Sequence, residues 1–170
     1  MKQGLDNLNS LPPEDASAEL LKCCGSMRWA ERMAAERPFE VVAELLESAD
    51  RIWWGLEPQD WLEAFSHHPK IGEKKAAATQ SADAARWSEQ EQSGTRTAAE
   101  ELLAELVALN RAYEERFGFI FIVCASGKTT EEMIALLKER LHNDTDTELR
   151  VAAEEQRRIT HLRLRKLLER

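Results

Sequence analysis

Residues 38–54, PFEVVAELLESADRIWW, indicate the architecture of the chain. Apolar side chains recur here in steps of three and four residues, which is the spacing of one helix face. They are Val41, Val42, Leu45, Leu46, Ala49, Ile52 and Trp53. Gly55 interrupts the pattern directly afterwards. We therefore expect an amphipathic helix over residues 38–54.

The same helical period extends over most of the chain on both sides of this segment. Further helices are expected over residues 26–36, 59–67, 95–117, 129–142 and 146–170, with Ser26 as one N-cap and Thr129 or Thr130 as another. Residues 70–94 show no persistent apolar period, and such a long connection inside a compact domain is often functional. The chain contains no internal repeat and no linker composition, which predicts a single all-α domain over residues 1–170.

Residues 119–124, FIFIVC, are β-like in composition, but the sequence offers no second strand to pair with them. We expect one short, buried, extended segment rather than part of a sheet. Buried amide and carbonyl groups need hydrogen-bond partners, and a polar ligand is one source of such partners.

Composition excludes several classes of protein. The 170 residues carry 31 acidic and 23 basic side chains, and the net charge of −8 disfavours a nucleic-acid surface. The longest apolar run, residues 119–125, is far shorter than the ~20 residues of a membrane helix. No apolar signal segment opens the sequence, so a cytoplasmic protein is expected. Cys23, Cys24 and Cys124 resemble small buried residues of a reducing compartment rather than a disulfide framework.

The doublet His67-His68 precedes Pro69. Adjacent side chains on a helix point about 100° apart, so the doublet is poorly placed to share a metal ion. His142 and His161 are isolated on other predicted helices, and we expect no metal site. The residue before a proline is pushed out of the helical region, which places His68 at a chain corner. There it suits a general acid or hydrogen-bond donor, although a satisfied structural histidine fits the pattern as well.

Two further polar features have a structural and a functional interpretation. Ser88 and Glu91 have the spacing of a helix capping box, but Glu91 and Gln92 can also offer a carboxylate and an amide to a ligand or to the histidine. Arg163 falls at the edge of the apolar face of the last helix. A guanidinium there requires an anion, which is supplied either by a structural salt bridge or by a substrate carboxylate.

In chain order, the motifs resemble the 2-oxo-4-hydroxy-4-carboxy-5-ureidoimidazoline (OHCU) decarboxylases over essentially the whole chain. The resembling pieces are Leu5-Asp6-Asn7-Leu8-Asn9, Cys24-Gly25-Ser26-Met27-Arg28-Trp29, Arg37-Pro38-Phe39, His68-Pro69-Lys70-Ile71-Gly72, Ser88-Glu89-Gln90-Glu91-Gln92, Leu109-Asn110-Arg111-Ala112-Tyr113, residues 117–125, Arg140-Leu141-His142-Asn143-Asp144 and residues 159–164. Many members have an aspartate-leucine-alanine run after His-Pro, whereas Lys70-Ile71-Gly72 resembles a bacterial branch.

This resemblance implies an all-helical, usually dimeric enzyme that uses neither metal nor organic cofactor. Members remove CO2 from OHCU to give (S)-allantoin, after uricase and hydroxyisourate hydrolase have acted. By motif, His68 matches the catalytic histidine. The substrate-contacting residues that the resemblance implies are Pro69, Ser88, Glu91, Gln92 and Arg163, together with main-chain groups of Phe121, Ile122, Val123, Cys124 and Ala125.

The residue types fit this chemistry. OHCU carries its carboxylate beside a ring C=N bond that can accept the electrons left by CO2, so the protein supplies orientation, charge stabilisation and a proton on one face. His68 suits the general acid beside Glu91, and Arg163 suits polar oxygens of the substrate. The alternatives are a non-enzymatic helical interaction domain, and a hydrolase or isomerase that acts on another ureido compound.

Overall fold

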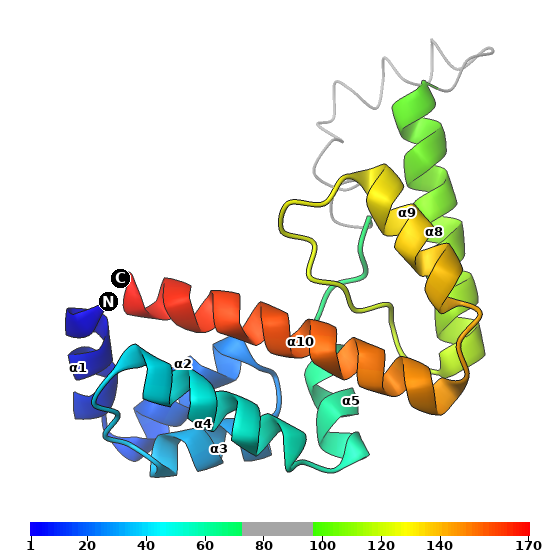
Figure 1. Ribbon diagram of the computed structural model, residues 1–170. Coiled ribbons are helices and arrows are strands. Elements are labelled where there is room, and N and C mark those ends of the chain that lie inside the picture. Colours follow the sequence, from blue (N-terminus) through cyan, green and yellow to red (C-terminus); the bar gives the residue numbers. More distant parts are fainter. Residues whose placement is uncertain (73–96) are drawn as a thin grey trace. The chain divides into compact units, whose positions relative to one another are not determined.

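The computed structural model describes residues 1–72 and 97–170, and within them it contains eight helices and no strand (Figure 1). The helices are α1 (Lys2–Ser10), α2 (Pro13–Cys23), α3 (Met27–Ala35), α4 (Val42–Trp54), α5 (Pro58–Ser66), α8 (Ala98–Phe117), α9 (Thr130–Arg140) and α10 (Thr145–Leu168). The predicted all-α class is confirmed. None of the helices in these ranges has the length and apolar character needed to cross a membrane.

The described residues group into two compact units. The first consists of residues 1–67 and 149–170, and the second of residues 68–148. The expectation of one domain over residues 1–170 stays a prediction.

Tryptophan side chains connect the helices of the first unit. The indole N–H of Trp29 on α3 donates to the carbonyl of Ala49 on α4 at 3.1 Å. Trp53 on α4 donates to Ala153 on α10 at 3.0 Å, and Trp61 on α5 donates to the carbonyl of Trp53 at 3.0 Å. Each ring therefore buries a large apolar surface while its one polar group is satisfied.

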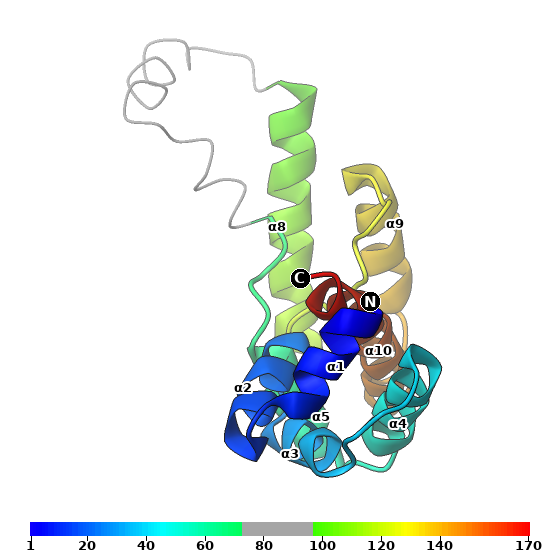
Figure 2. The same cartoon turned by 90° about the vertical axis from the view of Figure 1, so that its left-hand side faces the viewer.

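The first helix packs against the end of the last one. In two views at right angles, α1 lies beside the C-terminal end of α10 (Figures 1 and 2). A Cβ atom added to Gly4 would lie 2.2 Å from the main-chain oxygen of Leu168, so only glycine permits this approach. Helices α1 and α2 are missing from the sequence predictions, although Pro13 in the first turn of α2, followed by Glu14 and Asp15, is a typical helix start.

The predicted start of the helix at Pro38 is wrong, because α4 begins at Val42. The side chain of Asn9 binds both main-chain groups of Phe39: its Nδ2 donates to the carbonyl at 2.8 Å, and its Oδ1 accepts from the amide at 3.0 Å. Arg37 donates through Nη1 to the carbonyls of Leu8 and Leu11 at 2.5 and 2.8 Å. These bonds hold residues 37–39 against the end of α1 and compete with helix formation.

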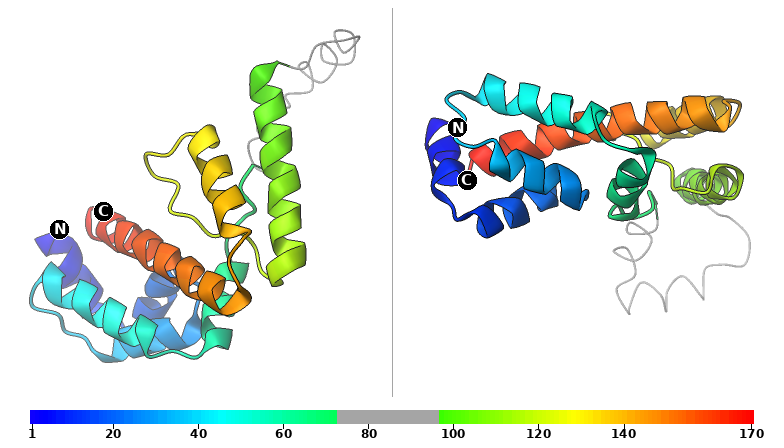
Figure 3. Two further views of the ribbon diagram at one scale, coloured as in Figure 1. Left: turned by 45° about the vertical axis from the view of Figure 1, so that its right-hand side comes forward. Right: turned by 90° about the horizontal axis from the view of Figure 1, so that it is seen from below.

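In the second unit, α8 and α9 lie side by side and run in the same direction, and residues 118–129 return along them (Figures 1 and 3). Gly118 ends α8 with a φ of 80°. The segment that follows is neither helix nor strand, and Phe119, Phe121 and Val123 are buried, as predicted. Tyr113 of α8 packs against the rings of Phe119 and Phe121, with centroid distances of 5.8 and 5.3 Å.

The role of Asn9 leads to a stability prediction. Asn9→Ala removes both bonds to Phe39 and leaves buried main-chain groups unsatisfied, so it should lower the free energy of unfolding by about 1–3 kcal/mol. Asn7→Ala is the matched control, because Asn7 lies on the same helix and is exposed. Urea unfolding of both variants checks this, and equal losses of stability would contradict the assigned role.

Candidate active site

The histidine doublet lies at the end of α5, which begins with a capping box between Glu57 and Asp60 and ends at Ser66. His67 is the C-cap, and its Nδ1 lies 3.0 Å from the carbonyl oxygen of Glu63. Its ring packs on Gly25, where an added Cβ would lie 2.6 Å from the ring. His67 therefore holds the end of α5 within the first unit.

His68 lies beyond the helix and is half-buried, in agreement with the corner predicted from Pro69. It opens the second unit, where the residues after it bind α8. Asn110 of α8 donates through Nδ2 to the carbonyl of Ile71 at 3.1 Å, and Lys70 Nζ pairs with Glu114 Oε2 at 2.8 Å. The chain that leaves His68-Pro69 is thus held against one face of α8. In the sequence, the feature that could have pointed to Asn110 is a side-chain amide on the otherwise apolar face of this helix.

In the extended segment after Phe119, some main-chain groups are hydrogen-bonded and others are not. The carbonyl of Ile122 accepts a bond of 2.7 Å from Arg140 Nη1, and the carbonyl of Cys124 accepts one of 2.9 Å from Lys128 Nζ. The amide N–H groups of Phe121, Ile122 and Val123 have no hydrogen-bond acceptor among residues 1–72 and 97–170. Because buried amides are nearly always paired, these donors are suited to a ligand.

Side-chain exposure changes along the same segment. Phe121, Ile122 and Val123 are at most 5% exposed, whereas Cys124 is half-buried and Ala125 is exposed. The segment therefore passes from the interior to the surface over five residues, 121–125, all of which were predicted to contact substrate. Main-chain groups of this segment therefore lie close to solvent while the neighbouring side chains are buried.

A buried ion pair that no local sequence pattern indicates supports this segment. Arg140 of α9 and Glu148 of α10 have side chains that are 7% and 0% exposed, and Arg140 Nε donates to Glu148 Oε1 at 2.6 Å. The hydroxyl of Tyr113 donates to the same oxygen at 2.5 Å. Burial, together with the Glu148 carboxylate, raises the pKa of Tyr113 well above its usual range, so the phenol remains a donor.

Arg163 lies on α10 in the first unit and is half-buried. It lines a concavity of about 200 Å³ together with Lys22, Lys166, Arg170, Glu19 and Cys23. Its Nη1 lies 3.5 Å from the carbonyl of Lys22. This excess of positive charge is suited to an anion. Burial outweighs the neighbouring cations and raises the pKa of Cys23 to about 11, so this thiol stays protonated.

The predicted site residues are therefore only partly placed by the structure. His68, Pro69 and residues 121–125 belong to the second unit, and Arg163 belongs to the first. Ser88, Glu91 and Gln92 lie outside the described residues. Cys23 and Cys24 are free and buried, as predicted, while Cys124 is only half-buried. Within the described ranges, no group of three or more His, Cys, Asp or Glu side chains is placed to hold a metal ion.

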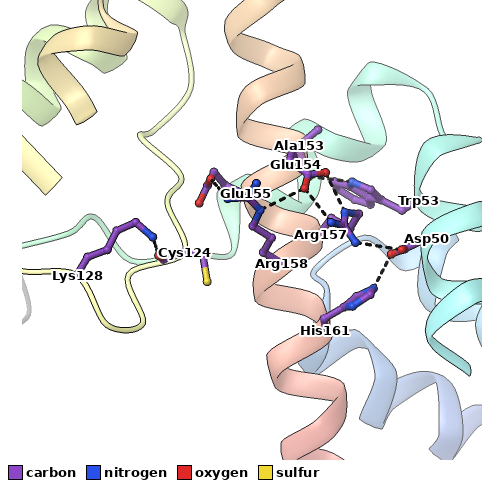
Figure 4. Close-up of polar contacts among 10 residues, drawn as sticks. All are labelled: Asp50, Trp53, Cys124, Lys128, Ala153, Glu154, Glu155, Arg157, Arg158 and His161. Carbon is purple, nitrogen blue, oxygen red and sulfur yellow. Dashed lines mark hydrogen bonds and ion pairs between the residues drawn. The ribbon is translucent and has the colours of Figure 1, made fainter. Parts of the chain in front are cut away.

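His161 precedes Arg163 by two residues and takes part in a structural network (Figure 4). Its Nε2 lies 2.6 Å from Asp50 Oδ1, and Arg157 Nη1 donates to Asp50 Oδ2 at 3.0 Å. Arg157 also forms two bonds of 2.8 Å with Glu154, which lower the pKa of that carboxyl group. The network joins α4 to α10 and leaves no reason to assign His161 to a catalytic site.

Known proteins resemble the chain along nearly all of its length. A family model described as OHCU decarboxylase matches residues 9–165. The uric acid degradation bifunctional protein TTL of Arabidopsis thaliana is 45% identical over 147 residues, which are 85% of this chain and 45% of that protein. The chain therefore spans less than half the length of this relative, and 32% of the bifunctional protein PucL of Bacillus subtilis.

Two relatives have nearly the same length as the chain. The 2-oxo-4-hydroxy-4-carboxy-5-ureidoimidazoline decarboxylase of Haloferax volcanii is 30% identical over 79% of this chain and 77% of its own. A crystal structure of OHCU decarboxylase in the presence of (S)-allantoin matches with a TM-score of 0.72 and 39% identity, covering 89% of this chain and 98% of that one. At this identity and coverage, similarity extends to sequence as well as fold.

The contact between Gly25 and His67 can be tested by substitution. Gly25→Ala should lower the free energy of unfolding by about 1–3 kcal/mol, because the new methyl group overlaps the imidazole. His67→Ala in the same chain should recover most of this loss, because it makes room for the methyl group. Gly55→Ala is the control, since its Cβ would meet no atom closer than 3.4 Å. Urea denaturation measures all three, and a Gly25→Ala chain as stable as the unsubstituted protein would refute the contact.

Proposed function

The chain belongs to the OHCU decarboxylase family, and we propose that it removes CO2 from OHCU to form (S)-allantoin in the degradation of urate. The observation that carries this proposal is the family match over residues 9–165, which includes the His68-Pro69 corner and the whole extended segment. The match to a crystal structure of OHCU decarboxylase in the presence of (S)-allantoin, which covers 98% of that protein's chain, supports the same product.

The proposed reaction begins with a carbon–carbon bond cleavage that leaves an electron pair on the substrate. The pair passes into the adjacent C=N bond, and a proton delivered to one face of the ring then yields a single enantiomer. His68 is the proposed general acid, because imidazole exchanges a proton near neutral pH and the corner before Pro69 lies outside the helix. The ring of the neighbouring His67 instead packs on Gly25, and its Nδ1 contacts the carbonyl oxygen of Glu63.

The amides of Phe121, Ile122 and Val123 are the proposed donors to the ureido and ring oxygens of the substrate. Their lack of acceptors among residues 1–72 and 97–170 supports this role. Main-chain N–H groups that face the substrate recognise carbonyl oxygens without the conformational entropy loss of long side chains.

Charged side chains are further proposed contacts of the substrate. Arg163 supplies a positive charge for the substrate's anionic oxygens, and the cations around it favour this role. Glu91 orients His68 and the substrate hydroxyl, with Pro69, Ser88 and Gln92 as further contacts, on the strength of the family motif alone. A cofactor-independent reaction and a homodimer are likewise proposed from the family resemblance. A single domain and a cytoplasmic location are proposed from the sequence pattern.

The catalytic assignment is tested with a stopped assay on freshly generated OHCU, following optically active allantoin by circular dichroism. The unsubstituted chain should form (S)-allantoin in enantiomeric excess over the racemate that arises spontaneously. His68→Asn should slow this reaction by about 10²–10⁴-fold, the usual contribution of general acid–base catalysis. His67→Asn is the matched control and should keep most of the activity. A His68→Asn chain that works at nearly the original rate would exclude His68 as the catalytic group.

A further inference from the structure

Arg140 is a buried cation that the proposed reaction does not use. Its guanidinium binds Glu148 Oε1 through Nε and Nη2, at 2.6 and 2.5 Å, and the carbonyl of Ile122 through Nη1 at 2.7 Å. It also lies over the ring of Phe121, 4.5 Å from the centroid. Arg140 is therefore bonded to the extended segment on one side and to α10 on the other.

The charge of Arg140 is balanced by a carboxylate that is itself fully satisfied. Glu148 is 0% exposed, and its Oε2 accepts a bond of 2.9 Å from Asn143 Nδ2 while Oε1 accepts from the hydroxyl of Tyr113 at 2.5 Å. The network thus joins α8, α9, the start of α10 and the extended segment within the second unit. Because every member has a partner, the guanidinium is held in one orientation.

The geometry of the peptide bond then determines where the N–H of Val123 points. The C=O of Ile122 and the N–H of Val123 belong to the same planar trans peptide and point in opposite directions. Since Arg140 draws the carbonyl toward itself, the N–H of Val123 must point away from Arg140. That N–H is one of the donors without an acceptor among residues 1–72 and 97–170.

We propose that Arg140, held by Glu148, is a positioning residue that turns the peptide between Ile122 and Val123 so that the N–H of Val123 faces the substrate. The proposal rests on the proposed function. It assigns no contact between Arg140 and the substrate. The bond to a main-chain carbonyl explains why a guanidinium is needed here: a planar fork can bind a carboxylate and a carbonyl at once, whereas an ammonium cannot match both.

The test separates positioning from mere stability. Arg140→Met alone would leave Glu148 charged and unpaired in the interior, so the informative variant is the double substitution Arg140→Met/Glu148→Gln, which removes both charges. Arg116→Met is the matched control. Arg116 belongs to the same unit, donates to the carbonyl of Asn143 at 2.8 Å and lies over a phenylalanine ring, but it does not touch residues 121–125.

Steady-state kinetics on OHCU, well below the unfolding temperature of each variant, give the readout. We expect the double variant to raise KM about tenfold, because a misdirected donor weakens binding of substrate and transition state alike, and to lower kcat by less than about threefold. Arg116→Met should change neither constant. Arg140→Lys, which keeps the charge without the fork, should give an intermediate KM, and it decides the matter if the double variant does not fold.

The possible failures are distinguishable. A folded double variant, or a folded Arg140→Lys chain, with an unchanged KM overturns the positioning role while the decarboxylase assignment stands. A loss of kcat that merely follows the folded fraction overturns it as well. An unsubstituted chain that forms no (S)-allantoin overturns the proposed function, and this inference with it.

Discussion

Phe119, Phe121, Ile122 and Val123 lie buried on a non-helical backbone, and residues 1–72 and 97–170 hold no strand with which this backbone can pair. Helices satisfy their own main-chain groups, but this segment must find partners elsewhere. Arg140 supplies one to the carbonyl of Ile122, and Glu148 balances the charge that this requires. The amides of residues 121–123 keep no acceptor in residues 1–72 and 97–170. The same constraint that demands a buried ion pair thus leaves donors for a ligand.

The two histidines of the doublet differ in their surroundings, because the helix ends between them. His67 caps α5 and packs on Gly25, so its ring has a structural position. His68 leaves the helix, and the residues after it are bound to α8 by Asn110 and Lys70. His68 itself is half-buried and has no helical position, so the corner before Pro69 leaves its ring for the role of proton donor that we propose.

Periodic patterns allowed α3, α5, α8, α9 and α10 to be predicted to within a few residues, because their apolar faces repeat at helical spacing. The start of α4 was misjudged, since side-chain bonds from Asn9 hold Phe39 in a non-helical form and only the tertiary structure brings them together. Arg140 and Glu148 are typical of exposed helix positions in sequence, and their burial depends on Tyr113 and Ile122, which are distant along the chain. His68 was predicted from its proline and its motif, and its catalytic role stays a prediction, whereas the buried network of Arg140 and Glu148 had no local signal.

Nuclear magnetic resonance of the ¹⁵N-labelled chain during titration with (S)-allantoin tests the central claim most directly. The amide resonances of Phe121, Ile122 and Val123 should shift strongly and saturate together, and these amides should become protected from hydrogen exchange. The amide of Asn7, which is exposed on α1, should stay unchanged. Saturable binding of (S)-allantoin that leaves residues 121–123 unperturbed would contradict the claim that these main-chain donors form the substrate site.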